Sequence, residues 1–303
     1  MSSTMIQLIT ECTQELGIPT PSTVAGNNSQ DVVQLLALMN ACGYELLRRA
    51  DWRELTRQHT FYTEASTATA SWVDGVAVIT GLASTAGLST QYQVQGVGIP
   101  NATYITGVGP TSVTLNYAPT ETVVNGQVIF QKVKYDLPAD YVSTVNRTHW
   151  DKSKRWEMLG PESAQQWEWL LSGYISTGPR IRWRLLGKYF QIWPGTNGGE
   201  LLGFEYRSAA WAEAADGTPK NSFTADNDTC IYPDRLMVLG TKLKYFEAKG
   251  FDTTALYRDY LMEFETAVAQ DTAGANLSFA PRPGTVLIGY DNLPDSSYGT
   301  SST

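Results

Sequence analysis

The stretch NRTHWDKSKRWEMLGPESAQQWEWLLSG, residues 146–173, decides the fold of this chain. It opens a longer segment, 146–211, that contains seven of the nine tryptophans, with arginines and lysines among the first of them. Aromatic residues beside cations at this density fit four roles: a sugar platform, a nucleic-acid surface, a subunit interface or a core. Which of these roles applies decides what the protein does.

Hydrophobic spacing divides this segment into a helix followed by strands. A proline in the first turn and a glycine at the end predict a helix over 161–173. Alternation of arginine with apolar residues in RIRWRLL (180–186) predicts a half-buried strand. The runs KYFQIWP and ELLGFEYRSAAW add two more strands, and an antiparallel meander is the simplest arrangement. Because Trp167 and Trp183 fall at apolar positions of these elements, we expect most tryptophans in the core and the rest at subunit interfaces.

Both ends of the chain predict helices. Apolar residues at helical spacing follow 5–16 and 31–51 near the start, and 233–250 and 252–274 near the end. We expect these helices to pack into one bundle around the β material. The run WRELTRQHTFYTEA after the second helix has the alternation of a strand, and DLPADY (136–141) predicts a turn and a short helix.

The composition changes abruptly in the middle of the chain. From Gly75 to Thr120 there is no charged residue, and short Val- and Ile-rich runs are separated by glycine or proline, which is typical of short strands and tight turns. The expected class is therefore α+β. The predicted organisation is an adaptor-like core over 1–65 and 132–274, an inserted β-rich module over 66–131, and an extended C-terminal arm over 275–303 with several prolines and little periodicity.

The whole-chain composition narrows the class of protein. The net charge of −8 argues against an exterior that grips nucleic acid, although an acidic wall would let DNA slide past. The three cysteines are far apart and in no metal-binding spacing, so buried free thiols are expected. No apolar run is long enough for a membrane span, and the first residues show no secretory signal.

The sequence predicts no catalytic centre. The two histidines, His59 on a strand and His149 beside a tryptophan, are expected in surface or capping roles, since no nucleophile motif accompanies them. Glu157, Glu162 and Glu168 lie near tryptophans and could serve a glycosidase, but carboxylates on a helix face are more often only solvated. We therefore expect no enzyme activity.

Neither a metal nor a phosphate site is predicted. Residues 226–228 (Asp-Asn-Asp) lack the turn glycine and closing glutamate of a calcium loop, so a helix-entry loop is expected. The glycines of 96–109 precede no strand-to-helix switch, so turns between strands are expected. The arginine row of 180–184 is expected to be solvated or to meet acidic partners on a neighbouring subunit. No cofactor is expected.

Four parts of the sequence resemble a known family. DLPADYVSTVNRTHWDKSKRWEMLGPESAQQWEWL (136–170), GFEYRSAAW (203–211) and FTADNDTCIYPDRLMVLGTKLKYFEAKGFD (223–252) resemble the head-to-tail adaptors of short-tailed bacteriophages, the tail tubular protein A or gatekeeper type. The helical opening ECTQELGIPTPSTVAGNNSQDVVQLLALMNACGYELLRRADWREL (11–55) is similar to the start of the same family. The likeness covers residues 5–64 and 132–275.

The middle of the chain resembles a different module. AGLSTQYQVQGVGIPNATYITGVGPTSVTLNYAPT (86–120) is similar to a small β-module of phage structural proteins with the core V-x-G-x-G-I-P-x-x-T-x-I. Gln91 stands where that module commonly has a glycine.

The adaptor resemblance implies a non-enzymatic virion protein in the neck of the phage. It implies a ring, typically of twelve copies, between the portal protein and the tail nozzle protein, with DNA passing through the lumen without sequence-specific binding. The C-terminal arm would dock on the portal, and its candidate anchors are Phe279, Pro281, Arg282, Leu287 and Tyr290. Candidate subunit-interface residues are Trp150, Arg155, Trp156 and Trp169.

Two alternatives remain open from the sequence. The first is a carbohydrate-binding or glycan-degrading tail component that uses the tryptophan-rich stretch as a sugar platform. The second is a tail fibre or decoration protein, suggested by the β-module, although the flanking helices argue against it.

Overall fold

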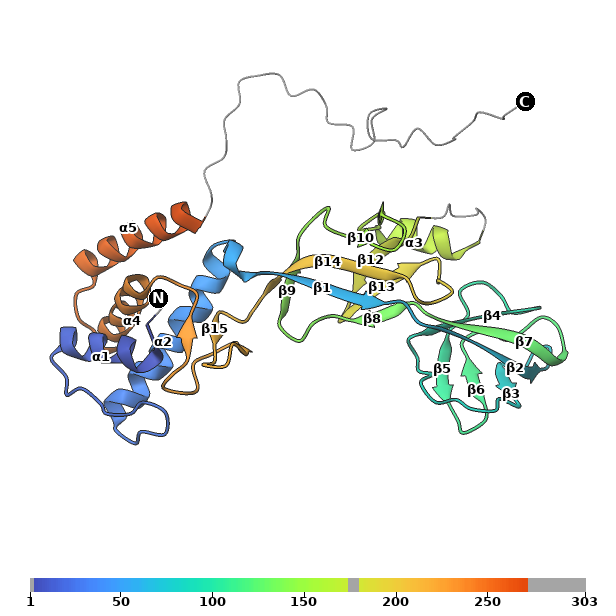
Figure 1. Ribbon diagram of the computed structural model, residues 1–303, viewed down its shortest axis with the longest axis horizontal. Helices are drawn as coiled ribbons and strands as arrows, with labels where there is room; N and C mark the ends of the chain where they lie inside the picture. Colours follow the sequence, from blue (N-terminus) through green and yellow to red (C-terminus); the bar gives the residue numbers. More distant parts are fainter. Residues whose placement is uncertain (1–2, 174–179, 272–303) are drawn as a thin grey trace, which may run out of the picture.

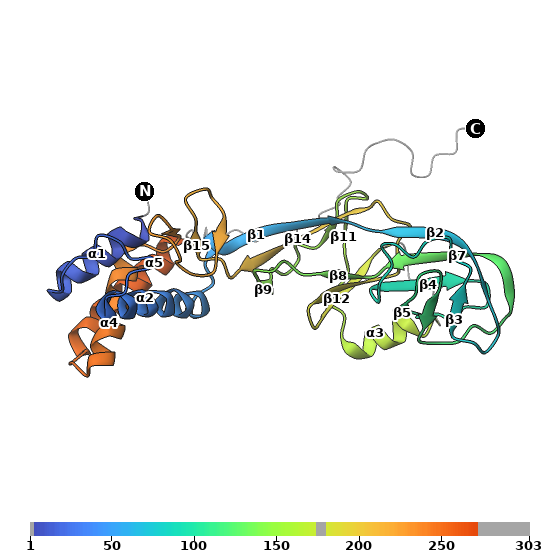
Figure 2. The same cartoon turned by 90° about the horizontal axis from the view of Figure 1, so that it is seen from below.

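The structure, a computed structural model, describes residues 3–173 and 180–271. The molecule is elongated, with helices at one end and a six-stranded sheet at the other (Figure 1). Two further sheets and one helix lie in the middle of the molecule. Strand β1 (Thr56–Tyr62) leaves the helical end and leads directly into β2 (Ala65–Trp72) of the far sheet, as Figures 1 and 2 both show. The mixed α+β class predicted from the sequence is confirmed.

Four helices pack together at one end of the molecule. They are α1 (Met5–Leu16), α2 (Gln30–Arg49), α4 (Asp234–Lys249) and α5 (Thr254–Asp271). Helix α4 contacts the other three. In α1 the apolar residues Met5, Leu8, Ile9 and Cys12 recur on one face and are fully buried. The helix ends at Gly17, whose φ of 69° suits glycine. The helical end is therefore held by the apolar stripes that the sequence displays.

Two glycines allow the closest approaches in this core. A methyl group on Gly43 of α2 would lie 2.4 Å from the ring of the buried Trp211, and one on Gly240 of α4 would lie 2.3 Å from the Cys42 sulfur. The three cysteines are buried and unpaired, as predicted, and burial raises the pKa of the Cys42 thiol to about 12. Within the described ranges, no helix is both long and apolar enough to cross a membrane.

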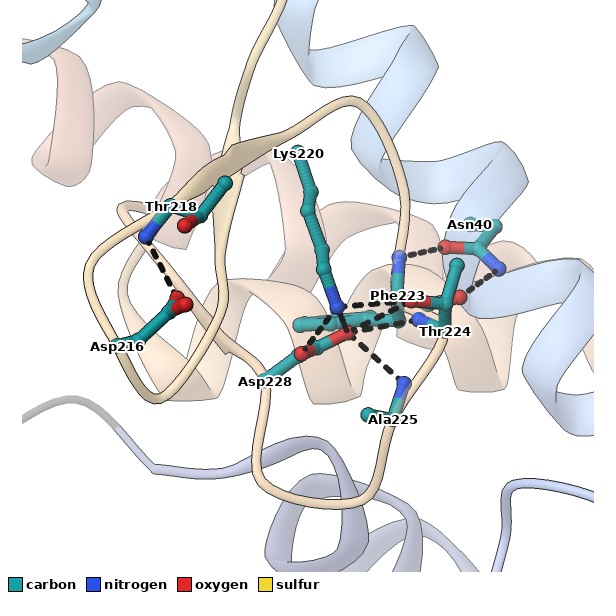
Figure 3. Close-up of polar contacts among 8 residues, drawn as sticks. All are labelled: Asn40, Asp216, Thr218, Lys220, Phe223, Thr224, Ala225 and Asp228. Atoms are coloured by element: carbon teal, nitrogen blue, oxygen red, sulfur yellow. Dashed lines mark hydrogen bonds and ion pairs between the residues drawn. The ribbon is translucent and has the colours of Figure 1, made fainter.

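A polar clasp, residues 220–228, fastens this end together (Figure 3). The Asp228 carboxylate accepts hydrogen bonds from Lys220 Nζ at 2.8 Å and from the N–H groups of Thr224 and Ala225 at 2.8 and 2.9 Å. The side-chain amide of Asn40, on α2, accepts from the N–H of Phe223 at 2.8 Å and donates to its carbonyl at 3.3 Å.

Backbone carbonyls of the polar clasp also accept hydrogen bonds from the first turn of α1. The carbonyl of Asp228 accepts from the N–H of Met5 at 2.7 Å, and the carbonyl of Asp226 accepts from the N–H of Ile6 at 3.2 Å. These bonds satisfy donors that the first turn of a helix leaves unpaired. The helix-entry role predicted for 226–228 therefore belongs to α1.

The middle of the molecule consists of two sheets packed on an aromatic core. The first sheet has the order β1-β14-β10-β11, with β9 also paired to β14, and the second has the order β12-β13-β8. Their bounds are β8 (Lys134–Asp136), β9 (Tyr141–Thr144), β10 (Trp150–Asp151), β11 (Trp156–Glu157), β12 (Arg182–Leu186), β13 (Tyr189–Trp193) and β14 (Leu201–Ser208). All of these pairings are antiparallel.

The predicted meander is wrong at its third strand. Strands β12 and β13 form the expected hairpin, but β14 pairs with β1 along the full length of β1. The reason is face-to-face packing: Phe204 of β14 lies against Phe190 of β13, with ring centroids 5.0 Å apart, so β14 covers β13 instead of extending its edge.

The core also corrects the prediction for His149. Its side chain is 1% exposed, and its ring stacks on Trp183 with centroids 3.6 Å apart. Nε2 lies 2.8 Å from the Thr144 hydroxyl, and burial lowers the pKa of His149 to about 4. The predicted surface or capping role is therefore wrong, because a neutral imidazole packs as one more aromatic ring. His59 lies on β1, as predicted.

Two helix predictions near this core also need correction. No helix forms at 136–141, since Asp140 accepts hydrogen bonds from Tyr206 and Ser208 of β14 and holds this segment as a turn before β9. Helix α3 (Ala164–Leu171) begins three residues after the predicted Pro161, because the Ser163 hydroxyl caps it by accepting from the N–H of Gln166 at 3.2 Å.

The uncharged middle of the chain folds into the six-stranded sheet. Its order is β4-β7-β2-β3-β6-β5, and all its pairs are antiparallel. The remaining bounds are β3 (Val78–Thr80), β4 (Tyr92–Gly96), β5 (Ile105–Val108), β6 (Val113–Leu115) and β7 (Val123–Lys132). One face packs its own core around Trp72, Val94 and Phe130. The predicted short strands of this region are confirmed.

A third, small sheet lies beside the helices. It consists of β15 (Ala212–Glu213), β16 (Pro219–Lys220) and β17 (Thr229–Cys230), with β15 in the centre. These strands bring the chain from β14 back to α4, and they bracket the polar clasp.

Candidate functional site

Two predicted interface residues, Trp150 and Arg155, line one groove on the outer face of the first central sheet. The groove has a volume of about 430 Å³. Its lining is Gln58, Arg147, Thr148, Trp150, Lys152, Arg155 and Glu205. Gln58 and Glu205 are paired neighbours on β1 and β14, so these strands form the floor and the loops around β10 form the rim. We call this site the basic groove.

A tight hairpin places Arg155 at the rim. Strands β10 and β11 pair Asp151 with Trp156, which leaves a four-residue loop between them. The buried Asp151 carboxylate accepts from the N–H groups of Ser153 and Lys154, both at 3.0 Å. Arg155 closes the loop with a φ of 58°, a left-handed conformation that usually falls to glycine, asparagine or aspartate.

Arg147 is also held in a turn with a left-handed backbone conformation. It has a φ of 62° in the turn between β9 and β10. The Thr148 hydroxyl beside it donates to the carbonyl of Val145 at 2.7 Å and accepts from the N–H of Glu205 at 3.0 Å, which fixes the turn on β14. Two arginines in a conformation that L-residues avoid therefore line one groove, and such outliers persist where the surrounding structure enforces them.

The cations of the groove have no ionic partner among the described residues. Arg147, Lys152 and Arg155 are exposed and form no ion pair there, whereas the adjacent Lys154 pairs with Glu200 at 3.4 Å. Lys152 crosses the sheet above Gly203, where a methyl group would lie 2.9 Å from its Cε. Three cations and one carboxylate beside a half-buried indole suit an anionic group, because guanidinium forks bind carboxylates and phosphates bidentately.

The arginine row of β12 is not available for such binding. Arg182 pairs with Glu162 at 2.5 Å, and Arg184 donates to Gln191 at 2.8 Å while its guanidinium lies 4.5 Å from the ring centre of Trp167. These two arginines are therefore satisfied within the chain, which corrects the expectation of solvent or a neighbouring subunit.

The other predicted site residues lie elsewhere. Trp156 on β11 is 36% exposed and Trp169 on α3 is 48% exposed, and neither lines the basic groove. Trp167, Trp183 and Trp211 are buried, as expected for core tryptophans. The five candidate arm anchors Phe279, Pro281, Arg282, Leu287 and Tyr290 lie outside the described residues.

Five of the seven groove residues are not among those predicted from the sequence: Gln58, Arg147, Thr148, Lys152 and Glu205. Arg147 and Lys152 stand beside the tryptophans and could have been chosen by their charge. Gln58 and Glu205 carry no such signal, since only the pairing of β1 with β14 brings them to the groove.

No cluster of three or more metal-ligating side chains occurs in 3–173 or 180–271. The candidate carboxylates have structural surroundings: Glu162 holds Arg182, and Asp228 holds the polar clasp. No protein-family model matches the chain, and no curated protein matches it.

Proposed function

We propose that this protein is the head-to-tail adaptor of a short-tailed bacteriophage, a structural ring component between the portal and the tail nozzle. The observation that carries the proposal is how the two stretches resembling such adaptors, 5–64 and 132–275, fold onto each other. Helix α2 from the first packs on α4 from the second, and β1 pairs with β14. The stretch between them forms a sheet of its own.

The proposed arrangement is a closed ring, with twelve copies as the expected number and the helices of both chain ends as one bundle. The basic groove is the proposed seam between copies. Each copy has a net charge of −8, so acidic side chains of a neighbouring copy are the most abundant partners for Arg147, Lys152 and Arg155. An acidic lumen would let DNA slide, because the backbone phosphates would find few counter-charges. The proposed location is the neck of the virion.

Assembly tests the proposal. We expect electron microscopy and mass measurement of the protein mixed with the portal protein of the same phage to show one ring seated on the portal. The double variant Arg147→Glu, Arg155→Glu should leave a folded monomer. The matched control Lys188→Glu, an exposed hairpin cation outside the groove, should assemble normally. A wild-type protein that neither forms a ring nor binds the portal would refute the proposal, and a trimer would favour a tail fibre or decoration protein.

One observation favours the carbohydrate-binding alternative. Trp156 and Trp169 keep 36% and 48% of their surface exposed, and exposed indoles bind sugar rings by stacking. Glycan binding that disappears in Trp156→Ala or Trp169→Ala would favour this alternative. Binding that persists in both variants would exclude these tryptophans as the platform.

A further inference from the structure

Two adjoining hollows lie where the six-stranded sheet faces helix α3. The first, of about 570 Å³, is lined by β4, β7 and the loop after β4, and the second, of about 600 Å³, by that loop, the segment after β6 and the end of α3. Pro100 and Asn101 belong to both linings, so the hollows meet at this loop. Each hollow has the volume of a small-molecule site.

The linings are almost free of charge and rich in carboxamides. Glu168 is the one charged residue in either lining. Gln95, Asn101 and Gln127 contribute side-chain amides that form no hydrogen bond with any described residue. An amide both donates and accepts, so these groups match ligands whose groups also do both.

A fourth amide is buried and incompletely satisfied. Gln93 is 1% exposed and lines the first hollow, and its Oε1 has no hydrogen-bond partner in the described part of the chain. An unpaired buried carbonyl destabilises the fold that contains it. This oxygen has almost no accessible surface, so it is not itself a contact for a ligand.

The loop between the hollows is fixed in advance of any ligand. Ala102 has a φ of 57°, which is unfavourable for alanine. The Asn116 amide holds the loop by accepting from the N–H of Tyr104 at 2.6 Å and donating to the carbonyl of Ala102 at 3.3 Å. The Thr103 hydroxyl donates to the carbonyl of Pro100 at 2.6 Å. A rigid loop lowers the entropy cost of binding.

Apolar surface stands beside the amides. Ile99 and Pro100 line the first hollow, and Tyr117, 55% exposed, lines the second. The edge of β4 is not open to a peptide strand at this point, since the N–H of Val94 already donates to the carbonyl of Thr103 at 2.8 Å. The neutral amides, the exposed tyrosine and the closed strand edge favour a hydroxyl-rich ligand with apolar C–H faces.

We propose that the two hollows form a binding site for a neutral oligosaccharide, with Gln95, Asn101 and Gln127 as hydrogen-bonding groups and Tyr117 as the stacking surface. This site differs from a platform on Trp156 or Trp169, and it does not depend on ring assembly.

Titration of the full-length protein by ligand-observed NMR tests the proposal. The probes are maltotriose, cellotriose and the trimer of N-acetylglucosamine, with trigalacturonate as the charged counterpart. We expect saturable binding of at least one neutral trimer and none of trigalacturonate. Gln95→Ala and Asn101→Ala should each weaken binding about five- to tenfold, while Gln165→Ala, which removes an exposed amide from α3, and Trp156→Ala should leave it unchanged.

Gln93→Met provides a second measurement. It should raise the midpoint of urea unfolding, because the unpaired oxygen is removed, and it should leave sugar binding unchanged, because that oxygen is out of a ligand's reach. No binding of any neutral trimer, or binding that Gln95→Ala and Asn101→Ala leave unchanged, would overturn the proposal.

Discussion

Replacement of Asp228 by asparagine should loosen the helical end of the molecule. The Asp228 side chain is 1% exposed, and it accepts from Lys220 Nζ at 2.8 and 3.1 Å as well as from two backbone N–H groups. Asparagine keeps an oxygen for the N–H groups but turns an amide toward the ammonium. A hydrogen bond to a charged group contributes about 1.5–3 kcal/mol, and water reaches the 27% exposed Lys220, which limits the cost.

We therefore expect Asp228→Asn to lower the free energy of unfolding by about 2–3 kcal/mol. Urea unfolding should show a lower midpoint at an unchanged slope. Hydrogen exchange should accelerate in α1, since the Asp228 carbonyl begins that helix. The control Asp216→Asn concerns an exposed carboxylate that bonds only Thr218 nearby, so it should change little.

The stabilisation by Asp228 should depend on pH in a defined direction. Burial alone would raise the pKa of Asp228, but hydrogen bonds from Lys220 and from the N–H groups of Thr224 and Ala225 outweigh it and hold the pKa below its ordinary value. The stabilisation is fully present above the unfolded pKa of about 3.9 and is lost as the pH falls through the lower folded pKa. A variant as stable as wild type at pH 7, with unchanged exchange in α1, would refute this account of the clasp.

Three further changes have defined outcomes. Gly43→Ala should lower the free energy of unfolding by about 1–3 kcal/mol, since its methyl group would overlap the Trp211 ring. Adding Trp211→Phe to that variant should recover part of the loss, and additive losses in the double variant would contradict this explanation. As the pH falls from 6.5 to 4, the free energy of unfolding of the wild type should decrease by about 3 kcal/mol more than that of His149→Phe, because the histidine is protonated first in the unfolded chain. Urea unfolding at several pH values measures this, and the same pH dependence in both proteins would contradict it. Arg155→Gly should raise the urea midpoint by relieving a φ of 58° yet weaken ring assembly, whereas Arg155→Ala should weaken assembly without the gain in stability.

Local patterns were enough to predict the four helices at one end of the molecule and the short strands of the six-stranded sheet. The stripe of α1 and its stop at Gly17 depend on residues close together in sequence, and the structure reproduces them. The third strand of the expected meander could not be placed in this way. Its partner, β1, precedes it by more than a hundred residues, and only the fit of Phe204 onto Phe190 decides between pairing and stacking.

The candidate site was partly visible in the sequence. Trp150 and Arg155 were selected because tryptophan and arginine are enriched at interfaces, and they do line one groove. Trp156 and Trp169 were selected for the same reason but lie outside it. Composition could not separate them, because Trp156 lies on β11 and Trp169 on α3, and only the fold places these elements relative to the groove.

Backbone strain distinguishes the two proposed binding surfaces more sharply than composition does. In the described part of the chain, the non-glycine residues with positive φ are Ala102, Asn125, Arg147 and Arg155. Asparagine tolerates this conformation because its side chain bonds locally, so Asn125 requires no special account. The other three do, and each lines a hollow: Arg147 and Arg155 the basic groove, and Ala102 the amide-lined site. Strain of this kind persists only where neighbouring contacts enforce it, and in this molecule it is concentrated at the two surfaces for which binding is proposed.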